Sequence, residues 1–415
     1  MTLRTIAIRA AAAALVLALS GPGEAQLALP GRIDPLDTLE RVGDTVHNVA
    51  ERVVDPLASA AQGAADRLDS RLARLQRFVA GSRGAVEWDD RHEPARAGEV
   101  LLLDPDAQSL ARAQKAGFVS LEQGTIGDLG IAYARLAVPR GQSLAAAVKA
   151  LRAAVPGHEV SADTIHFESG AATRAARAPA GATQLPRGGT VGVIDGGVAG
   201  SDRVVAQKGF AAGAPHASQH ASAIVSLLKG AGTARIVAAD VYGTDPAGGG
   251  ALAIARAIGW MTGQGVRTIS ISLVGPANPL LARTIAAARG RGAVVVAAVG
   301  NDGPAAPPAY PASYPGVVAV TGVDGRGRVL IEAGRASHID YAAPGADMTA
   351  TIPGKGRTSL RGTSFAAPLA AARIAARMAG GAAPAEALKG VDGEARGASR
   401  RTGRGVLCMD CRTGI

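Results

Sequence analysis

From residue 190 onward, short apolar runs alternate with segments of helical periodicity. TVGVIDGG (190–197), VRTISISLVG (266–275) and AVVVAAVGN (293–301) are rich in Val and Ile and are typical of buried strands, whereas HASAIVSLLKG (220–230) and PLLARTIAAARGRG (279–292) repeat apolar residues at helical spacing. Strands of this kind separated by helices predict an α/β domain with a mostly parallel sheet and helices on both faces. In such a sheet, functional side chains gather at the carboxyl ends of the strands.

The segment before this sheet has a different order of elements. Between residues 99 and 167 the pattern is strand, helix, strand, strand, helix, strand, which predicts a small ferredoxin-like α+β unit within 91–170. Residues 171–189 are rich in Ala, Gly, Pro and Arg and have no periodicity. This stretch is therefore expected to be an exposed linker of the kind that proteases cut.

An N-terminal segment, 26–90, contains a third pattern. Leu and Val recur at spacings of three and four between residues 36 and 79, with an interruption at Pro56, which predicts two amphipathic helices. A packing or spacer role is favoured over a partner-binding coiled coil, because the heptads are short.

Residues 1–25 have the features of a signal peptide. Arg4 and Arg9 supply positive charge, Ala10 to Leu19 form an unbroken apolar run, and Ala25 is a small residue suited to the cleavage position. No later run of 18 or more apolar residues occurs, so no membrane span is expected. The protein is predicted to be exported, to the periplasm or outside the cell.

Composition and charge narrow the classes of function. Hydrophobic residues make up 47% of the 415 residues but aromatic residues only 3%, so the core must be largely aliphatic. The formal charge is 44 − 34 = +10, and much of it lies in Arg-rich connecting stretches with few aromatic residues and no nucleic-acid motif. No nucleic-acid partner is expected. In the Arg-rich C-terminal tail, 386–415, Cys408 and Cys411 form either a local disulfide, which an oxidising compartment favours, or two free thiols.

Three sites carry candidate chemistry. Asp195 ends an apolar strand, where an acid is costly unless it is paired, although an Asp that caps the next turn would look the same. Ser364 begins a small-residue helix, where a serine is commonly an N-cap. His216 and His220 stand four apart, as metal ligands on a helix can. No Glu lies in the position that a zinc motif requires and no third ligand is evident, so no metal centre is expected.

Taken together, these residues predict nucleophilic catalysis. An acid, an imidazole and a hydroxyl occur in the order Asp, His, Ser, each at the edge of a different element. A serine hydroxyl needs an adjacent imidazole to accept its proton, and the imidazole needs a carboxylate to hold its tautomer. This chain order is that of subtilisin rather than of chymotrypsin or the α/β-hydrolases.

Residues 190–380 resemble the subtilisin-like serine proteases. VGVIDGGV looks like the Asp motif of that family, with Asp195 as the acid, and GTSFAAPLAAA matches its serine motif, with Ser364 as the nucleophile. VVVAAVGNDGP resembles the strand that carries the oxyanion-hole Asn, here Asn301. The resemblance also implies substrate-binding residues on two strands: Ser272, Leu273, Val274, Gly275, Ala298, Val299 and Gly300.

The resemblance distinguishes the two histidines. HASAIVSLLKG fits the family's His motif when it starts at His220, which makes His220 the base and His216 incidental. This sequence departs from the family pattern at Ala221, where Gly is usual, and at Gly196, where a hydroxylated residue is usual. Val274 also stands where the family usually has Gly, which points to a narrowed primary pocket and modest apolar side chains in the substrate.

The expected protein is thus an exported serine endopeptidase made as a zymogen. The resemblance implies that residues 91–170 are a propeptide, that this prodomain is an intramolecular inhibitor, and that self-cleavage occurs within 168–189. Residues 190–385 would be the catalytic domain, acting on protein or peptide substrates without a cofactor. Structural calcium is left open, since no EF-hand-like loop is visible. The alternatives are a catalytically silent scaffold that binds peptides, and an exported binding protein built on the 36–79 helices. An esterase of the α/β-hydrolase type would need a G-x-S-x-G elbow, which is absent around Ser364.

Overall fold

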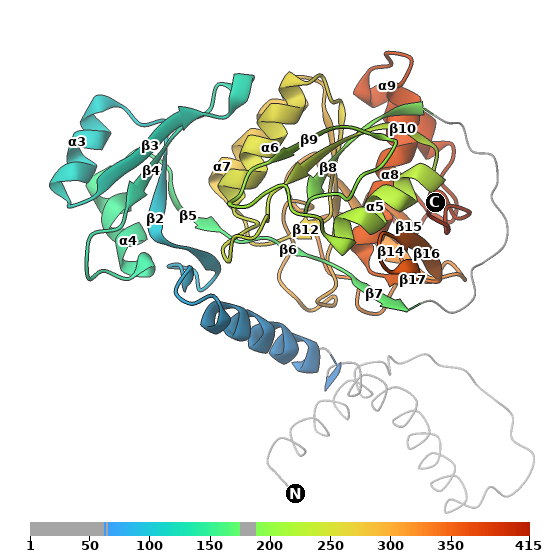
Figure 1. Ribbon diagram of the computed structural model, residues 1–415, viewed down its shortest axis with the longest axis horizontal. Coiled ribbons are helices and arrows are strands. Elements are labelled where there is room, and N and C mark those ends of the chain that lie inside the picture. The colour runs from blue at the N-terminus through green and yellow to red at the C-terminus, as the bar shows by residue number, and fades with distance from the viewer. Residues whose placement is uncertain (1–61, 64, 175–187) are drawn as a thin grey trace, which may run out of the picture. The chain divides into compact units, whose positions relative to one another are not determined.

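A seven-stranded parallel sheet forms the centre of the larger domain (Figure 1). The computed structural model describes residues 62–63, 65–174 and 188–415, so the predicted signal peptide, the first of the two predicted helices and most of the predicted linker lie outside the described residues. The strand order is β15-β14-β13-β11-β8-β10-β9. In chain order the strands are β8 (Gly188–Asp195), β9 (Val204–Gly209), β10 (Thr233–Asp240), β11 (Thr268–Ile271), β13 (Val294–Ala298), β14 (Val318–Val323) and β15 (Tyr341–Pro344).

Helices cover both faces of this sheet, which confirms the predicted α/β architecture. One face packs against α5 (Gln219–Gly230) and α8 (Thr363–Met378), and the other packs against α6 (Ala251–Gly263) and α7 (Pro279–Gly290). Alternate residues of each strand therefore enter different cores: Val193 packs toward α5 and α8, while Ile194 packs toward α6 and α7. Because both faces of the sheet are covered by apolar helix surfaces, the strand sequences are unbroken apolar runs.

A second sheet precedes the parallel one. Its central strands have the order β5-β2-β4-β3, all antiparallel, and two helices cover one face; this is the ferredoxin-like arrangement. β1 also pairs with β2, although it lies before residue 91, where the unit was predicted to begin. The elements are β1 (Val86–Trp88), β2 (Pro94–Leu103), α3 (Ala107–Lys115), β3 (Val119–Thr125), η1 (Gly127–Leu129), β4 (Ala132–Ala137), α4 (Leu144–Ala154) and β5 (Val160–Thr164). We call residues 86–164 the small unit.

The small unit shares a core with the parallel-sheet domain. One face of its sheet packs on α3 and α4, while side chains from the other face, including Leu101 and Tyr133, join the apolar cluster of α6 and α7. Polar contacts reinforce this junction at the helix N-termini. The Asp163 carboxylate accepts a hydrogen bond of 2.9 Å from the Leu252 amide in the first turn of α6. The Asn278 side chain caps α7 and donates to the Ala162 carbonyl of the small unit.

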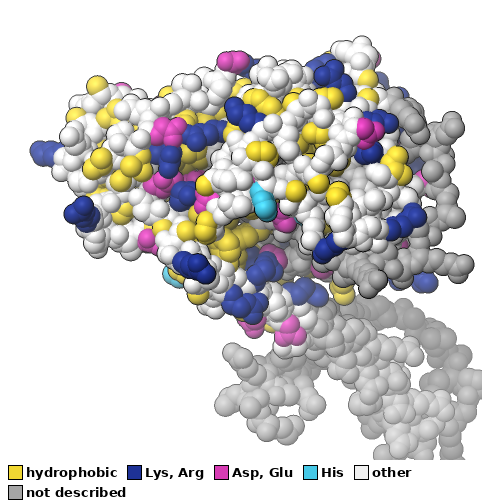
Figure 2. Space-filling model, viewed as in Figure 1, with side chains coloured by type: hydrophobic (Ala, Val, Ile, Leu, Met, Phe, Trp, Pro, Cys, Tyr) yellow, Lys and Arg dark blue, Asp and Glu magenta, His cyan; other side chains and the backbone are white. Residues whose placement is uncertain are grey.

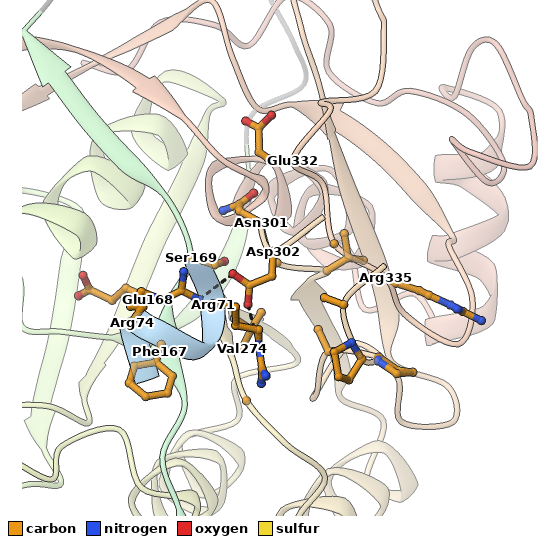
Figure 3. A pocket seen from close by; sticks show the side chains of 18 of the residues that line it. Arg71, Arg74, Phe167, Glu168, Ser169, Val274, Asn301, Asp302, Glu332 and Arg335 are labelled. Carbon is orange, nitrogen blue, oxygen red and sulfur yellow. Dashed lines mark hydrogen bonds and ion pairs between the residues drawn. The ribbon is translucent and has the colours of Figure 1, made fainter. Parts of the chain in front are cut away.

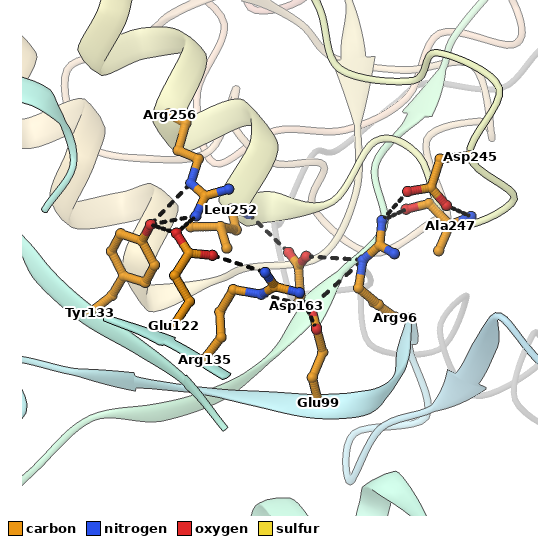
Figure 4. Close-up of polar contacts among 10 residues, drawn as sticks. All are labelled: Arg96, Glu99, Glu122, Tyr133, Arg135, Asp163, Asp245, Ala247, Leu252 and Arg256. Atoms are coloured by element: carbon orange, nitrogen blue, oxygen red, sulfur yellow. Dashed lines mark hydrogen bonds and ion pairs between the residues drawn. The ribbon is translucent and has the colours of Figure 1, made fainter. Parts of the chain in front are cut away.

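Charged side chains of both signs surround this junction (Figure 4). Arg96 of β2 lies 2.6 Å from the Asp245 carboxylate of the larger domain, and Arg256 of α6 contacts Glu122 and Tyr133 of the small unit. Burial raises the pKa of Asp163 to about 6, against the opposing effect of the Leu252 amide. The face seen in Figure 2 has Lys and Arg interspersed with Asp and Glu, without a continuous basic tract among its described residues.

Five short strands lie outside the two main sheets. β6 (Phe167–Glu168) pairs with β12 (Leu273–Val274), and β7 (Ala171–Arg174) pairs with β17 (Gly356–Arg361), which also pairs with β16 (Met348–Ile352). All three pairings are antiparallel. The chain leaving the small unit thus runs along two edges of the larger domain in turn, first at β12 and then at β17.

The described chain begins with a helix and ends with a segment that packs on the larger domain. Before the small unit, residues 65–81 form a helix, where the second of the two helices was predicted. After α8, the chain forms α9 (Pro384–Asp392), and then Leu407 enters the core beside α5 and α8. The predicted tail is therefore an integral part of the domain, and Cys408 and Cys411 are joined by a disulfide. None of the described helices is long and apolar enough to cross a membrane.

Candidate active site

Three side chains from three elements form a continuous hydrogen-bonded row. His220 Nδ1 lies 3.0 Å from both carboxylate oxygens of Asp195, and His220 Nε2 lies 2.9 Å from Ser364 Oγ. Asp195 is the last residue of β8, His220 is the second residue of α5, and Ser364 is the second residue of α8. The predicted acid, base and nucleophile thus meet at the carboxyl end of the parallel sheet, where parallel strands commonly hold a site.

Local chemistry fixes where each of these helices begins. The Ser218 hydroxyl accepts hydrogen bonds from the His220 and Ala221 amides, so α5 starts one residue before His220. In α8, Pro368 has no N–H to donate to the Ser364 carbonyl four residues earlier. The Ser272 hydroxyl donates to that carbonyl instead, at 2.8 Å. A residue predicted to bind substrate therefore also holds the first turn of α8.

Burial and charge set the state of the imidazole. Burial lowers the pKa of His220, but the Asp195 carboxylate and then the Glu168 carboxylate raise it, and the net pKa lies above the usual value. The Phe365 ring lies beside the imidazole, with ring centroids 5.2 Å apart. The arrangement can accept a proton from Ser364 and hold the resulting imidazolium beside a carboxylate.

Asn301 has one amide atom bound and one free. Its Oδ1 accepts a hydrogen bond of 3.0 Å from the Thr363 amide, while its Nδ2 is buried without a partner. A Cβ built on Gly362 would lie 3.0 Å from Asn301 Nδ2 and 3.2 Å from the Ser169 carbonyl oxygen. The unpaired amide and this carbonyl therefore face the same small space next to Ser364. A donor placed there can stabilise negative charge on a carbonyl oxygen.

The chain itself occupies the cleft in front of Ser364. Phe167 and Glu168 pair with Val274 and Leu273 in an antiparallel bridge, as an extended peptide would at a sheet edge. Beyond them, a Cβ built on Gly170 would lie 2.4 Å from Ser364 Oγ, so only a residue without a side chain fits that position as it stands. Gly170 thus lies directly beside the Ser364 hydroxyl.

Glu168 brings a second carboxylate to the same place. Its Oε1 accepts a hydrogen bond of 3.1 Å from the Ser218 hydroxyl. Desolvation and then the charge of Asp195 raise the pKa of Glu168 to about 7. Among the described residues, Glu168, Asp195 and His220 are the group whose ligand atoms all lie within 4.8 Å of one another, the spacing of a metal site. Both ring nitrogens of His220 already have hydrogen-bond partners, Asp195 and Ser364. The closeness of the three residues is therefore explained by these hydrogen bonds, without a bound metal.

A cavity of about 360 Å³ adjoins Ser169, and the 65–81 helix forms one of its walls (Figure 3). Two arginines of this helix contact Asp302, the residue that directly follows Asn301 in sequence. Arg74 lies 2.6 Å from the Asp302 carboxylate, and Arg71 lies 3.3 Å from it. Leu75 of the same helix is buried against the cavity. Further lining residues are Phe167, Glu168, Val274, Gly275, Val299, Gly300, Glu332 and Arg335.

The residues predicted to bind substrate divide into two groups. Val274, Gly275, Val299 and Gly300 line the cavity, whereas Ser272, Leu273 and Ala298 are buried and do not line it. His216 is exposed and stands outside the row of hydrogen bonds; its backbone amide donates to Asp240.

The sequence reasoning missed Glu168, Asp302 and the two arginines of the 65–81 helix. Their partners lie 27 to more than 220 residues away in the chain. No local sequence pattern indicates such contacts. Asp302, which directly follows Asn301, was the one sequence signal that the site is polar beside Asn301.

Comparison with known proteins places these residues in a family. The model of the subtilase family matches residues 204–386, a range that contains His220 and Ser364 but begins after Asp195. Subtilisin BL from Lederbergia lenta is 34% identical over 146 residues, which are 35% of this chain and 53% of that protein. Subtilisin DY from Bacillus licheniformis is 32% identical over 197 residues, which are 43% of this chain and 72% of that protein.

A solved structure has the same fold. Fervidolysin from Fervidobacterium pennivorans, described as a keratinolytic enzyme related to subtilisin, superposes with a TM-score of 0.64 at 18% sequence identity. The match covers 77% of this chain and 61% of that one. At this identity the likeness is informative about the fold alone. The aligned part of the chain spans about half the length of subtilisin BL.

Proposed function

Since this chain belongs to the subtilase family, we propose that it is a serine endopeptidase that hydrolyses protein or peptide substrates. The observation that carries the proposal is the row from Asp195 through His220 to Ser364, with contacts of 3.0 and 2.9 Å. These are the distances over which a base can take a hydroxyl proton. A hydroxyl that served only to cap α8 would not need an imidazole so placed.

The proposed reaction assigns one role to each group. Ser364 Oγ attacks the substrate carbonyl carbon as His220 Nε2 takes its proton, and Asp195 stabilises the imidazolium. The free Nδ2 of Asn301 and the backbone N–H of Ser364 stabilise the oxyanion. His220 then gives the proton to the leaving amine, and water hydrolyses the acyl-enzyme by the same route in reverse.

The proposal is tested by activity of the protein freed from residues before 170. Such a preparation should cleave denatured casein and react covalently with a fluorophosphonate probe. A catalytically silent scaffold that binds peptides in the same cleft is the alternative, and it would bind without cleaving or labelling. No cleavage and no labelling after removal of the N-terminal part would therefore reject the endopeptidase in favour of that scaffold.

We also propose that the protein is exported and made as a latent precursor in which the small unit is an intramolecular inhibitor. The basic and apolar pattern of residues 1–25 supports export, to the periplasm or beyond. Two features support latency: the small unit shares the core of α6 and α7, and residues 167–170 occupy the cleft as a substrate would. No other substrate can pair with β12 while β6 is bound there.

Self-cleavage of this precursor is proposed at the bond between Ser169 and Gly170. This bond lies within the 168–189 range expected from the sequence, at the border of the 171–189 linker. Its carbonyl shares the space of the free Asn301 amide, and its leaving side adjoins Ser364 Oγ. Both flanks are held in extended pairing, by β12 on one side and β17 on the other, which fixes the bond in reach of the hydroxyl.

Gly170→Pro should block this cleavage. The proline ring adds atoms where even a Cβ would lie 2.4 Å from Ser364 Oγ, so the bond cannot keep its place. Intact mass of the secreted wild type should give a large fragment that begins at Gly170, whereas Gly170→Pro should stay uncut at that bond. The matched control is Gly181→Pro in the linker, which should be cut like the wild type. A first cut that lies after residue 174 and is unaffected by Gly170→Pro would contradict the assignment.

A further inference from the structure

The side chain of Ser169 lies between two backbone walls. One wall is formed by Ser272 to Gly275 and the other by Val299 to Asn301. The Ser169 side chain is buried, and its hydroxyl donates to the Ser272 carbonyl at 3.4 Å. In the proposed reaction Ser169 is the residue whose carbonyl is attacked, the P1 residue. The space around it is therefore where the P1 side chain of any substrate must fit.

Val274 spans this space from one wall to the other. A Cβ built on Gly300 of the opposite wall would lie 3.3 Å from Val274 Cγ1 and 3.6 Å from Cγ2. Val274 and Gly300 thus face each other closely enough that a side chain at Gly300 would touch both methyl groups. Gly300 has a φ of +83°, a conformation that suits glycine and leaves no side chain of its own in the slot. In Figure 3, Val274 is one of the labelled side chains that line the cavity.

We infer that Val274 restricts the enzyme to substrates with a small P1 residue: Gly, Ala or Ser. The inference rests on the proposed endopeptidase function and specifies its substrate class. A flat aromatic or long aliphatic side chain would need the volume that the two Val274 methyl groups fill. The chain's own P1 residue, Ser169, is of the small class, as the inference requires. The polar Ser169 side chain also extends the expectation from the sequence, which was for modest apolar side chains.

The size of the effect follows from steric exclusion. A pocket that is one or two methyl groups too small typically discriminates between substrates by about 10- to 200-fold. We therefore expect kcat/KM for P1 Ala to exceed that for P1 Phe by at least about tenfold, although Phe offers more apolar surface to bury.

Peptide anilides that differ only at P1, with Ala, Ser, Leu or Phe, test this inference on the processed wild type, Val274→Ala and Val274→Gly. Expected results are preference for Ala and Ser in the wild type, and a gain of about tenfold or more for Phe in Val274→Gly. Circular dichroism and a thermal unfolding midpoint close to that of the wild type show that each variant is folded. Val205→Gly, an exposed valine on a strand remote from the cleft, is the control and should keep wild-type preference.

Each outcome separates the inference from the proposed function. A wild type that cleaves best after Phe or Leu, or a Val274→Gly variant whose preference is unchanged, overturns the role of Val274 and leaves the endopeptidase intact. A wild type that cleaves no peptide and takes no fluorophosphonate label overturns both. Cut sites mapped by mass spectrometry in denatured casein give a second measurement that does not depend on the chosen peptides.

Different contacts carry a second inference, on the 65–81 helix. It holds the strand in the cleft from outside: the Phe78 ring meets the Phe167 ring edge-on at 4.9 Å, and Arg71 and Arg74 bind Asp302 on the far wall. Asp302 is only 22% exposed, so these ion pairs are partly shielded from water. We propose that this helix is a clamp that keeps the small unit bound after the Ser169–Gly170 bond is cut.

The full chain tests the clamp through the delay between cleavage and the appearance of peptidase activity. Arg71→Gln/Arg74→Gln should shorten this delay by about three- to tenfold at low salt, with the same final activity, and residues before 170 should no longer copurify with 170–415. Higher salt should shorten the wild-type delay toward that of the variant. Arg77→Gln, an exposed arginine on the same helix, is the control. An unchanged delay and continued copurification in the double variant would overturn the clamp.

Discussion

Ser364→Ala is expected to abolish hydrolysis, with a loss in kcat on the order of 10⁶-fold, a magnitude known from the related subtilisins rather than derived from this structure. The reason is chemical: His220 Nε2 lies 2.9 Å from Ser364 Oγ, and without that oxygen it has no nucleophile to activate. Residual catalysis would come from Asn301 and from substrate binding.

The measurement needs a preparation that does not depend on self-cleavage. Limited trypsin treatment at the arginines of the 171–189 stretch cuts wild type and variant alike, and high salt then releases the small unit. Anilide hydrolysis and fluorophosphonate labelling are measured after this release. Ser201→Ala, a serine remote from the cleft, is the matched control and should retain full activity. Before trypsin treatment, intact mass should show a cut at Ser169 in the wild type and none in Ser364→Ala. Substantial activity in Ser364→Ala would remove the proposed mechanism.

Asp195→Asn should lower kcat by about 10⁴-fold, because an amide in place of the carboxylate favours the wrong imidazole tautomer and gives no charge to stabilise the imidazolium. The acid limb of the pH profile should move as well. Burial lowers the pKa of His220 and Asp195 raises it, so loss of the carboxylate leaves the lowering effect less opposed. Since the neutral imidazole is the active base, the weak remaining activity should then persist to lower pH than in the wild type.

The measurement is kcat/KM against pH on the processed enzyme, where Glu168 has left with the small unit and no longer contributes to the pKa of His220. Asp202→Asn, an exposed carboxylate paired with Lys229, is the control and should leave both the plateau and the acid limb in place. Activity within about tenfold of wild type in Asp195→Asn, or an acid limb that moves to higher pH, would show that Asp195 does not orient His220.

The elements of both domains were predictable because their signals are local. Alternating apolar runs placed the strands that became β8, β11 and β13, and the strand and helix order of residues 99–167 gave the small unit its antiparallel sheet. Asp195, His220 and Ser364 each stand at the end of such an element, within motifs that span about ten residues. A sheet of known strand direction then brings these positions to one edge.

The contacts of Ser169 and of the 65–81 helix were not predictable in this way. No motif around Ser169 indicates that its carbonyl lies near the Asn301 side chain. Ser169 is more than 60 residues from Asn301, and Asn301 is more than 60 residues from Ser364. The Arg74 contact with Asp302 spans 228 residues. The sequence showed that Val274 replaces the glycine that is usual in the family. Its distance to Gly300, however, depends on how closely two strand ends approach each other.

The sequence by itself therefore determined the elements, their order and the three residues that meet at the end of the sheet, because periodicity and short motifs are properties of neighbouring residues. Only the tertiary structure decided that Gly170 lies beside Ser364, that Arg71 and Arg74 reach Asp302, and that Val274 faces Gly300. Those features depend on packing distances between segments far apart in the chain, where a shift of one or two ångströms separates a contact from an open space.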